Sequence, residues 1–502
     1  MLTAAILLAV GIAAASWRMP PVWICIAGVA AGCVTAALCL RTHRTAATAA
    51  LAAALVFLGA VLAGVRLRSD MLPDDYAVYE IELGSDAVLR PDTRSRQGDA
   101  RIVARRGGNG EWHGVRGRVR IYADSALQLA EGQRIVCRGR IAPFGGDSGY
   151  EAMMRRKGYA GRLYLSSGNI LQINDREPSA LLRSMHRRAV DRISGLPLRP
   201  GNRAVALAVG TGESTMLGRS QRAGYSRAGT AHLLALSGLH VGIVYLLINL
   251  LLRWLPLLTH GHIIRSAAAV ILLWAYVFST GMPPSAVRAA LMFSMLQIAR
   301  AASADYSPLN ALACAAFASL CFDPGLLYDA GFRLSYISVA AIILCAVPLC
   351  RRLHISREHI GNHAAKALIP VANFIIDTLA VGFVATLATA PLVSHLFGVI
   401  PLAGIVAAPA AIAAAAATVA LTAVWIALPS GFAAQAFGRA IDLTAGAMNA
   451  ISEWIAARPA AALDIRLSGG ETVACYAVAT LLLCALAALA NRKSTTDNKH
   501  IR

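Results

Sequence analysis

Residues 229–244 read GTAHLLALSGLHVGIV and open a long apolar run. Polar and ionisable groups at membrane depth cost on the order of a few kcal/mol each, so they normally face a protein interior or a water-filled cavity. Ser237 and His240 are three residues apart, which predicts that they share one face of a helix. Gly238 and Gly242 form a small-xxx-small pair that lets another helix approach closely. The run therefore predicts a helix packed inside a bundle along a polar seam.

The composition is that of a membrane protein. Of the 502 residues, 57% are hydrophobic and 15% are charged, whereas a soluble globular protein carries about a quarter charged residues. Apolar runs of roughly 15–25 residues recur along the chain, the one above at 231–252, and they predict a polytopic α-helical protein with about 10–12 membrane helices. The net charge of +20 suits either anionic lipid headgroups or a polyanionic substrate.

Changes in composition divide the chain into segments. The short basic link at 41–44 between two apolar runs lies in the cytoplasm by the positive-inside rule, which puts residue 66 on the outer side. The segments are N-terminal membrane helices at 1–65, a β-rich soluble domain at 66–180, a basic amphipathic connector at 181–230, the main membrane domain at 231–430, C-terminal helices at 431–490 and a polar tail at 491–502.

The soluble insert reads as short strands joined by glycine turns. Val115–Ala123 and Gly132–Phe144 alternate apolar with basic residues, which predicts a small β-barrel or sandwich, with an OB-like barrel as the best single guess. Such barrels often bind single-stranded nucleic acid, although arginines that alternate along a strand also form its solvated face. The candidates for contact with DNA are Arg101, Arg105, Trp112, Arg116, Arg118, Arg120 and Tyr122.

Further polar groups lie at predicted membrane depth in the main membrane domain. Asp329 and Arg333 are at i, i+4, so they could neutralise each other as a helix ion pair. Several such places in one bundle instead favour a hydrophilic path through it. The candidates for the lining of that path are Ser237, His240, Ser285, Arg288, Asn310, Arg333 and His395.

Other chemistries find weaker support. Ser237 and His240 could act as nucleophile and base of an intramembrane serine hydrolase, but neighbours on one helix face rarely have the geometry for attack. A small-solute transporter would also have helices interrupted by glycine and proline, yet no internal repeat is visible. The residues GTGEST at 210–215 lack phosphate-loop spacing, and His260 and His262 read as loop histidines. We expect no metal, no cofactor and no enzymatic activity.

The main membrane domain contains four motif regions in a fixed order. They are HLLALSGLHVG at 232–242, TGMPPSAVRAALM at 280–292, DYSPLNALACAAF at 305–317 with DPGLLYDAGFRLSYISV at 323–339, and LATAPLVSHLFG at 387–398. In sequence and order these motifs resemble the ComEC family of bacterial competence proteins. The resemblance implies a competence-type channel domain at 231–430, in a multi-pass protein of the bacterial cytoplasmic (inner) membrane. It also implies uptake of single-stranded DNA in natural transformation, contact with membrane lipids, and a separate DNA receptor with a cytoplasmic ATPase or other energy source.

The chain also departs from that family. Many members end in a metallo-β-lactamase-like domain with an HxHxDH motif, which this sequence does not contain, so it resembles a short form without that nuclease. No ATPase or metal motif is present either. Position 333 is Arg where the resemblance leads us to expect Gln, and the helix predicted at 401–428 lacks an expected Asn.

Overall fold

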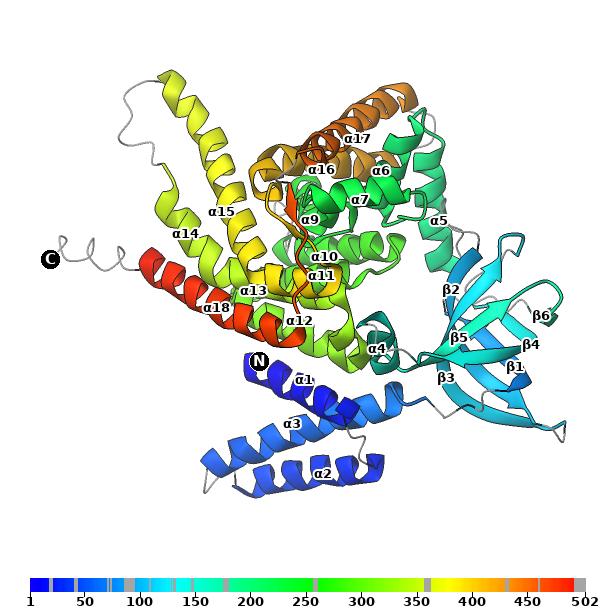
Figure 1. Ribbon diagram of the computed structural model, residues 1–502. Coiled ribbons are helices and arrows are strands. Elements are labelled where there is room, and N and C mark those ends of the chain that lie inside the picture. The colour runs from blue at the N-terminus through cyan, green and yellow to red at the C-terminus, as the bar shows by residue number, and fades with distance from the viewer. Residues whose placement is uncertain are drawn as a thin grey trace. The chain divides into compact units, whose positions relative to one another are not determined.

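We describe the protein from a computed structural model (Figure 1). It describes residues 1–17, 21–39, 44–69, 72, 75–84, 95–107, 110–127, 129, 132–145, 149–174, 180–255, 261–355, 363–428, 433–458 and 461–491. Most of the predicted basic link at 41–44, together with His260 and the tail from residue 492, lies outside these ranges. The chain forms two compact units, the first made of Met1–Arg183 and Ala313–Phe332, the second of Ser184–Leu312 and Arg333–Arg502.

The first unit begins with three apolar helices. These are α1 at Leu2–Trp17, α2 at Val22–Cys39 and α3 at Arg44–Arg66. Glycines allow α1 and α3 to touch through their backbones: a Cβ on Gly59 would lie 2.3 Å from the carbonyl oxygen of Leu8, so no side chain fits there. Close approach through small residues is how helices associate where water gives no driving force.

The soluble insert is a barrel. Its elements are β1 at Tyr76–Leu83, β2 at Ser95–Arg106, β3 at Trp112–Asp124, β4 at Arg134–Pro143, α4 at Gly149–Arg156, β5 at Tyr159–Leu165 and β6 at Ile170–Asn174. The strand order is β1-β2-β3-β5-β4-β6, and a further pairing of β1 with β4 closes the ring. The pairing of β3 with β5 is parallel, while the other pairings of this sheet are antiparallel. The predicted β-rich domain is therefore confirmed.

Alternation of residue types explains why these strands close on themselves. Every second residue points inward, so Tyr79, Ile81, Val119, Ile121 and Leu163 form a dry core while the residues between them face outward. Cys137 lies in this core as a free thiol, and its burial raises its pKa to about 12. The barrel thus buries its apolar set and leaves its arginines on the outer surface.

The remaining chain is mostly helical. Its helices are α5 at Ala180–Ser194, α6 at Pro200–Thr211, α7 at Arg219–Arg227, α8 at Ala231–Leu234, α9 at Gly238–Leu251, α10 at Gly261–Ser279, α11 at Pro284–Ala301, α12 at Pro308–Phe322, the 3₁₀ turn η2 at Pro324–Tyr328, α13 at Ala330–Ala341, the π turn η3 at Ile342–Ala346, α14 at Val347–Leu353, α15 at His363–Phe397, α16 at Gly404–Ala427, α17 at Ala434–Ala456 and α18 at Gly469–Asn491. A short pairing of β7 at Ile400–Pro401 with β8 at Ala462–Leu463 ties two loops together.

Length and composition make this a multi-pass membrane protein. Among the described residues, seven helices are long and apolar enough to cross a membrane. They are Val22–Cys39, Arg44–Arg66, Gly261–Ser279, Ala330–Leu353, Lys366–Phe397, Gly404–Ala427 and Gly469–Ala490, with shorter apolar helices at Leu2–Ala15, Gly238–Leu251 and Pro308–Phe322. The predicted polytopic helical architecture is confirmed at this level.

One predicted helix is broken in two. The sequence predicted a continuous helix over 231–252, but α8 ends at Leu234 and α9 begins at Gly238. The backbone at Ala235 and at Ser237 is extended, with φ of −83° and −112°, and Ser237 occupies the N-cap of α9. The expectation that Ser237 and His240 share a helix face is therefore wrong, because a serine side chain stabilises a helix end better than a helix interior.

Candidate functional site

The break before α9 brings Ser237 and His240 into direct contact. The backbone N–H of Ser237 donates to Nδ1 of His240 at 3.1 Å, as in a capping box, so the neutral imidazole carries its proton on Nε2. His240 has no exposed surface, and among the described residues its Nε2 has no hydrogen-bond partner. A buried donor without a partner costs about 1–3 kcal/mol, so the ring is set to donate to something that comes to it.

The beginning of α11 lies against this turn. Proline at its first position starts α11, and the hydroxyl of Ser285 donates to the carbonyl oxygen of Leu236, just before the N-cap. One turn later, Arg288 is 3% exposed, with its guanidinium carbon 5.5 Å from the ring centroid of Tyr336 on α13. Its Nη2 lies beside Gly238, where an added Cβ would be only 3.3 Å away. The two short motifs therefore meet at one place.

Within the part of the chain that the structure describes, the guanidinium of Arg288 has no carboxylate partner. Its Nη1 makes no hydrogen bond within the described part of the chain, and no carboxylate of that part pairs with it. The first turn of α9 adds partial positive charge, because helix N-termini present unsatisfied N–H groups. A buried cation without a partner is strongly unfavourable. Arg288 beside the first turn of α9 therefore forms a site whose chemistry attracts an anion, and the N–H of His240 Nε2 is a separate buried donor.

Further along α9 and α11 lies a polar network that the sequence did not reveal. Gln297 is 3% exposed and donates to the hydroxyl of Tyr245 at 3.0 Å and to Oδ1 of Asn249 at 3.1 Å. Arg300 donates to the same Tyr245 hydroxyl at 3.0 Å, and Arg265 on α10 donates to Asn249 Oδ1 at 3.3 Å. A sequence pattern does not reveal these contacts, because the partners on α9 and α11 lie 48–55 positions apart in the chain. The interface of α9 with α11 thus carries arginines toward both of its ends.

The other predicted lining residues do not join Arg288 through any hydrogen bond or ion pair of the described residues. Asn310 is exposed at the start of α12, where its backbone N–H lies 3.4 Å from the hydroxyl of Ser307. His395 is exposed at the end of α15, with Nδ1 3.0 Å from the carbonyl oxygen of Leu467. Arg333 is half-buried on α13, three residues before Tyr336. The sequence alone could not separate these from the residues that meet.

A second buried network joins α6, α7 and α17. Asn449 donates to Oδ1 of Asn202 at 2.9 Å and accepts from the Tyr225 hydroxyl at 3.0 Å and from Nε2 of Gln221 at 2.9 Å. Asn202 in turn donates to Oδ1 of Asp442 at 2.9 Å. The sequence predicted no site in these segments, because partners such as Asn202 and Asn449 lie 247 positions apart in the chain. Each group is satisfied by protein, so the network stabilises the fold and leaves no obvious place for a ligand.

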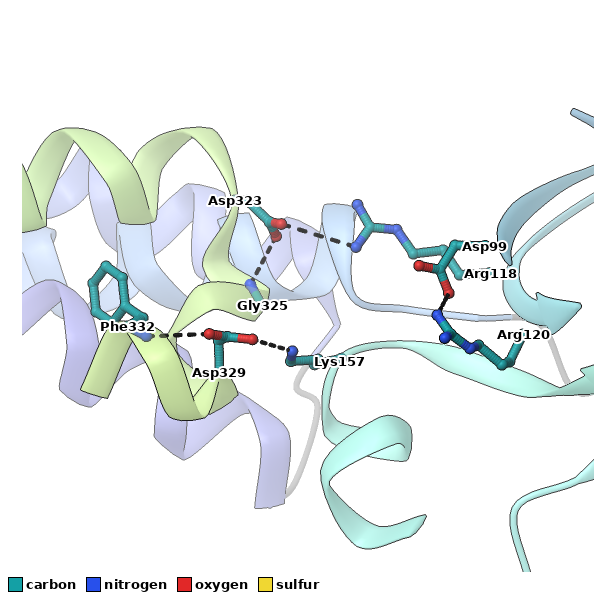
Figure 2. Close-up of polar contacts among 8 residues, drawn as sticks. All are labelled: Asp99, Arg118, Arg120, Lys157, Asp323, Gly325, Asp329 and Phe332. Atoms are coloured by element: carbon teal, nitrogen blue, oxygen red, sulfur yellow. Dashed lines mark hydrogen bonds and ion pairs between the residues drawn. The ribbon is translucent and has the colours of Figure 1, made fainter. Parts of the chain in front are cut away.

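The barrel arginines are mostly occupied by carboxylates. Arg105 pairs with Asp75 at 2.6 Å and Arg120 with Asp99 at 2.7 Å. Figure 2 shows the ion pair of Arg120 with Asp99 and also a third ion pair, in which Arg118 lies 4.0 Å from Asp323. Arg101, Trp112 and Arg116 are exposed. These pairs favour the solvated-face interpretation for part of the set.

An aromatic pair on the barrel is a better candidate for base contact. Tyr122 on β3 stacks on Tyr164 of β5, with ring centroids 5.3 Å apart and planes inclined by 25°. Tyr164 is 57% exposed, and both rings line a shallow pocket with Asn169. Tyr122 was predicted from the sequence and Tyr164 was not, because only the parallel pairing of β3 with β5 makes them neighbours.

Comparison with known proteins identifies the membrane domain. The family model described as Competence protein matches residues 209–492. The chain is 31% identical to ComE operon protein 3 of Bacillus subtilis (strain 168) over 155 residues, which is 29% of this chain and 19% of that protein. It is 28% identical to the uncharacterized protein YcaI of Escherichia coli (strain K12) over 254 residues, 48% of this chain and 33% of that one. The chain therefore matches a third or less of each relative's length. No solved structure matches it.

Proposed function

The chain belongs to the competence protein family, and we propose that it is a channel that carries single-stranded DNA across the bacterial cytoplasmic membrane during natural transformation. A multi-pass helical part and a soluble barrel in one chain suit such a role. The positive-inside rule puts the barrel on the outer side, where a strand would arrive. The net charge of +20 favours contact with a polyanion.

One observation carries the proposal: Arg288 is buried beside the first turn of α9 with Nη1 unpartnered among the described residues. A phosphodiester at this point would supply the missing negative charge and accept from the guanidinium. We propose His240, whose Nε2 has no partner among the described residues, as a further donor along the path. Tyr336 holds the guanidinium from one side through its ring face. Because the strand must also leave the channel, each phosphate can bind here only briefly before the next one replaces it.

The remaining lining candidates are part of the same proposal. We assign Ser237 and Ser285 to positioning, since one caps α9 and the other bonds to the carbonyl oxygen of Leu236. Arg333, Asn310 and His395 are proposed as lining residues at other points of the path. We further propose that a separate DNA receptor hands over the strand and that a cytoplasmic ATPase or another energy source drives it.

The barrel is proposed as an OB-like domain that receives the strand. Its five-stranded ring closed by β1 and β4 supports this assignment, as does the aromatic pair of half-buried Tyr122 and exposed Tyr164. Aromatic stacking binds bases without regard to sequence, which a general DNA importer needs. Arg101, Arg116 and Trp112 remain candidates for contact, whereas Arg105 and Arg120 serve ion pairs within the barrel.

The geometry argues against the serine hydrolase alternative. A general base must reach the hydroxyl of its nucleophile, but Nδ1 of His240 accepts from the backbone N–H of Ser237. A small-anion transporter would also use a buried arginine, so the test must separate the two. Proteoliposomes that import a labelled small anion and exclude labelled single strands would favour the transporter.

The decisive experiment is Arg288→Gln in a transformable host, measured as import of labelled DNA. We expect import to fall at least about tenfold, which corresponds to roughly 1.4 kcal/mol, while DNA bound at the cell surface is unchanged. Arg458→Gln is the matched control, because Arg458 also lies over an aromatic ring, that of Trp454 at 4.3 Å, but is exposed. Normal import by Arg288→Gln at normal protein level would refute the proposed site.

A further inference from the structure

The turn at 323–329 in the first unit carries two aspartates, each of which serves two structural elements (Figure 2). Oδ1 of Asp323 accepts from the N–H of Gly325 at 2.9 Å and so begins η2, while Oδ2 lies 4.0 Å from Arg118 of the barrel. Oδ1 of Asp329 accepts from the N–H of Phe332 at 3.1 Å, in the first turn of α13, while Oδ2 accepts from Nζ of Lys157 at 2.6 Å.

Because each aspartate binds the backbone with one oxygen and a barrel cation with the other, we propose that the turn is a docking site for the barrel. Asp329 is then a positioning residue through which Lys157 fixes the start of α13. One oxygen of each carboxylate stays within the membrane domain as a helix cap. The other oxygen faces a cation of the barrel. The same side chain therefore makes the docking contact and caps the helix, so loss of the ion pair should also loosen the helix start.

Lys157 is presented by a rigid turn. Lys157 directly follows the last residue of α4. The next residue, Gly158, has a φ of +80°, a conformation that residues with L side chains rarely adopt. A Cβ on Gly158 would lie 2.6 Å from the carbonyl oxygen of Leu67, just beyond α3, so this turn packs backbone to backbone. The backbone of Lys157 is therefore held in place while its ammonium group reaches Asp329.

The 323–329 turn makes further contacts within the first unit. The Tyr328 hydroxyl donates to the carbonyl oxygen of Ile12 on α1 at 3.4 Å, and the side chain of Leu67 lies 3.3 Å from a Cβ built on Gly325. The turn therefore meets α1, the end of α3 and the barrel together. Because the turn contacts the barrel and also leads directly into α13, a shift of the barrel would move the first turn of α13.

Of the two ion pairs, that of Lys157 with Asp329 is the stronger. Its side chains are 21% and 31% exposed, against 42% and 38% for Arg118 and Asp323, so water screens it less. Burial alone raises the pKa of Asp329, but the hydrogen bond and charge of Lys157 and the N–H groups of Phe332 and Gly331 outweigh it and hold that pKa below its ordinary value. The carboxylate is charged, as docking requires.

Two of the three arginines of β3, Arg118 and Arg120, divide between the turn and the barrel. Arg120 is retained within the barrel by Asp99 at 2.7 Å, while Arg118, two residues earlier on the same face, reaches Asp323 (Figure 2). Lys157 and Arg118 are therefore the barrel's docking cations. Since α13 runs on to Ala341, its start is also the start of the helix that carries Tyr336.

Hydrogen–deuterium exchange on the full-length protein in lipid nanodiscs tests the proposal without DNA. Lys157→Gln removes the cation, and Asp329→Asn removes the charge but keeps a good N-cap residue. We expect each variant to speed exchange of the amides in the first turns of α13 by about two- to fivefold, the range of a partly exposed ion pair. The double variant should exchange no faster than either single one, because both break one interaction.

Controls separate docking from a merely structural role. Arg138→Gln, on the exposed face of β4, should leave the exchange unchanged. Raising salt from 0.1 to 1 M shortens the Debye length from about 10 to about 3 Å, so it should speed exchange in the wild type but not in Lys157→Gln. Unchanged exchange in both single variants, or effects that add in the double variant, would overturn the proposal. Because no DNA is involved, that result is independent of the proposed channel function.

Discussion

Gly238 leaves the space that Arg288 occupies: a Cβ on Gly238 would lie 3.3 Å from Nη2 of the arginine. The same guanidinium lies 5.5 Å from the ring centroid of Tyr336. A glycine at the first position of α9 therefore determines where a buried cation can sit. At the next glycine of the helix, Gly242, an added Cβ would lie 3.5 Å from the ring of Phe293, which is an ordinary contact distance.

This difference makes two neighbouring glycines a matched pair. Gly238→Ala should displace the guanidinium and lower DNA import at least about tenfold, whereas Gly242→Ala should leave it nearly unchanged. Neither should destabilise the helix, because alanine is favoured over glycine there by roughly 0.5–1 kcal/mol. Import by each variant, at matched protein level, checks the prediction, and equal import by both would contradict it.

Removal of Asn449 should destabilise the protein. Its side chain bonds to Asn202, Tyr225 and Gln221, so Asn449→Ala leaves buried polar groups unpaired, each at a cost of about 1–3 kcal/mol. Thr444→Ala, on the same helix, loses only the hydrogen bond from the Thr444 hydroxyl to the carbonyl oxygen of Ile441. This change should lower the free energy of unfolding by no more than about 0.5 kcal/mol. Thermal unfolding in detergent compares the two variants. A smaller loss for Asn449→Ala would show that the network is not stabilising.

Glu213 should make stability depend on pH in the acid range. The hydrogen bond from His186 lowers the pKa of Glu213 from 4.5 to about 2, against burial, which raises it, and with help from Thr215. A carboxyl with a lowered pKa stabilises the fold above its ordinary value and loses that contribution as the pH falls toward the folded value. Glu213→Gln should therefore lower the unfolding temperature at pH 7, with a gap that closes between pH 4.5 and 2. A gap independent of pH would contradict the assignment.

The aromatic pair of the barrel should bind bases. Tyr164→Ala should weaken the affinity of the full-length protein for a short single strand by about 1–3 kcal/mol, the worth of one stacked base. Leu171→Ala is the control, because Leu171 is an apolar side chain of β6 with 60% exposure and no ring. Fluorescence anisotropy with a labelled oligonucleotide measures both. Equal losses would indicate general surface damage rather than stacking.

Much of the architecture could be predicted because membrane and barrel impose simple rules on residue type. Apolar runs such as Val22–Cys39 must be helices, since hydrocarbon offers backbone groups no other partner. The alternation in Val115–Ala123 indicates a strand with one buried face. The predicted approach of a helix to Gly238 and Gly242 is also confirmed, and α11 is that helix.

The errors have equally definite causes. The helix predicted over 231–252 breaks before Gly238, because the side chain of Ser237 is worth more at a helix end than inside one. The polar helices α6 and α17 were not assigned a site, because partners such as Asn202 and Asn449 lie 247 positions apart in the chain. Hydropathy averages over neighbours in sequence and cannot register a partner that distant.

Residue types and their periods were enough to establish a multi-pass protein with a β-rich insert and to indicate its family, because burial in lipid or in a barrel core selects side chains locally. Folding alone decided that Ser285 and Arg288 reach the turn at 236–238, and that Lys157 reaches Asp329. Such meetings depend on how helices cross and strands pair over long separations, and side-chain spacing along the chain carries no record of those distances.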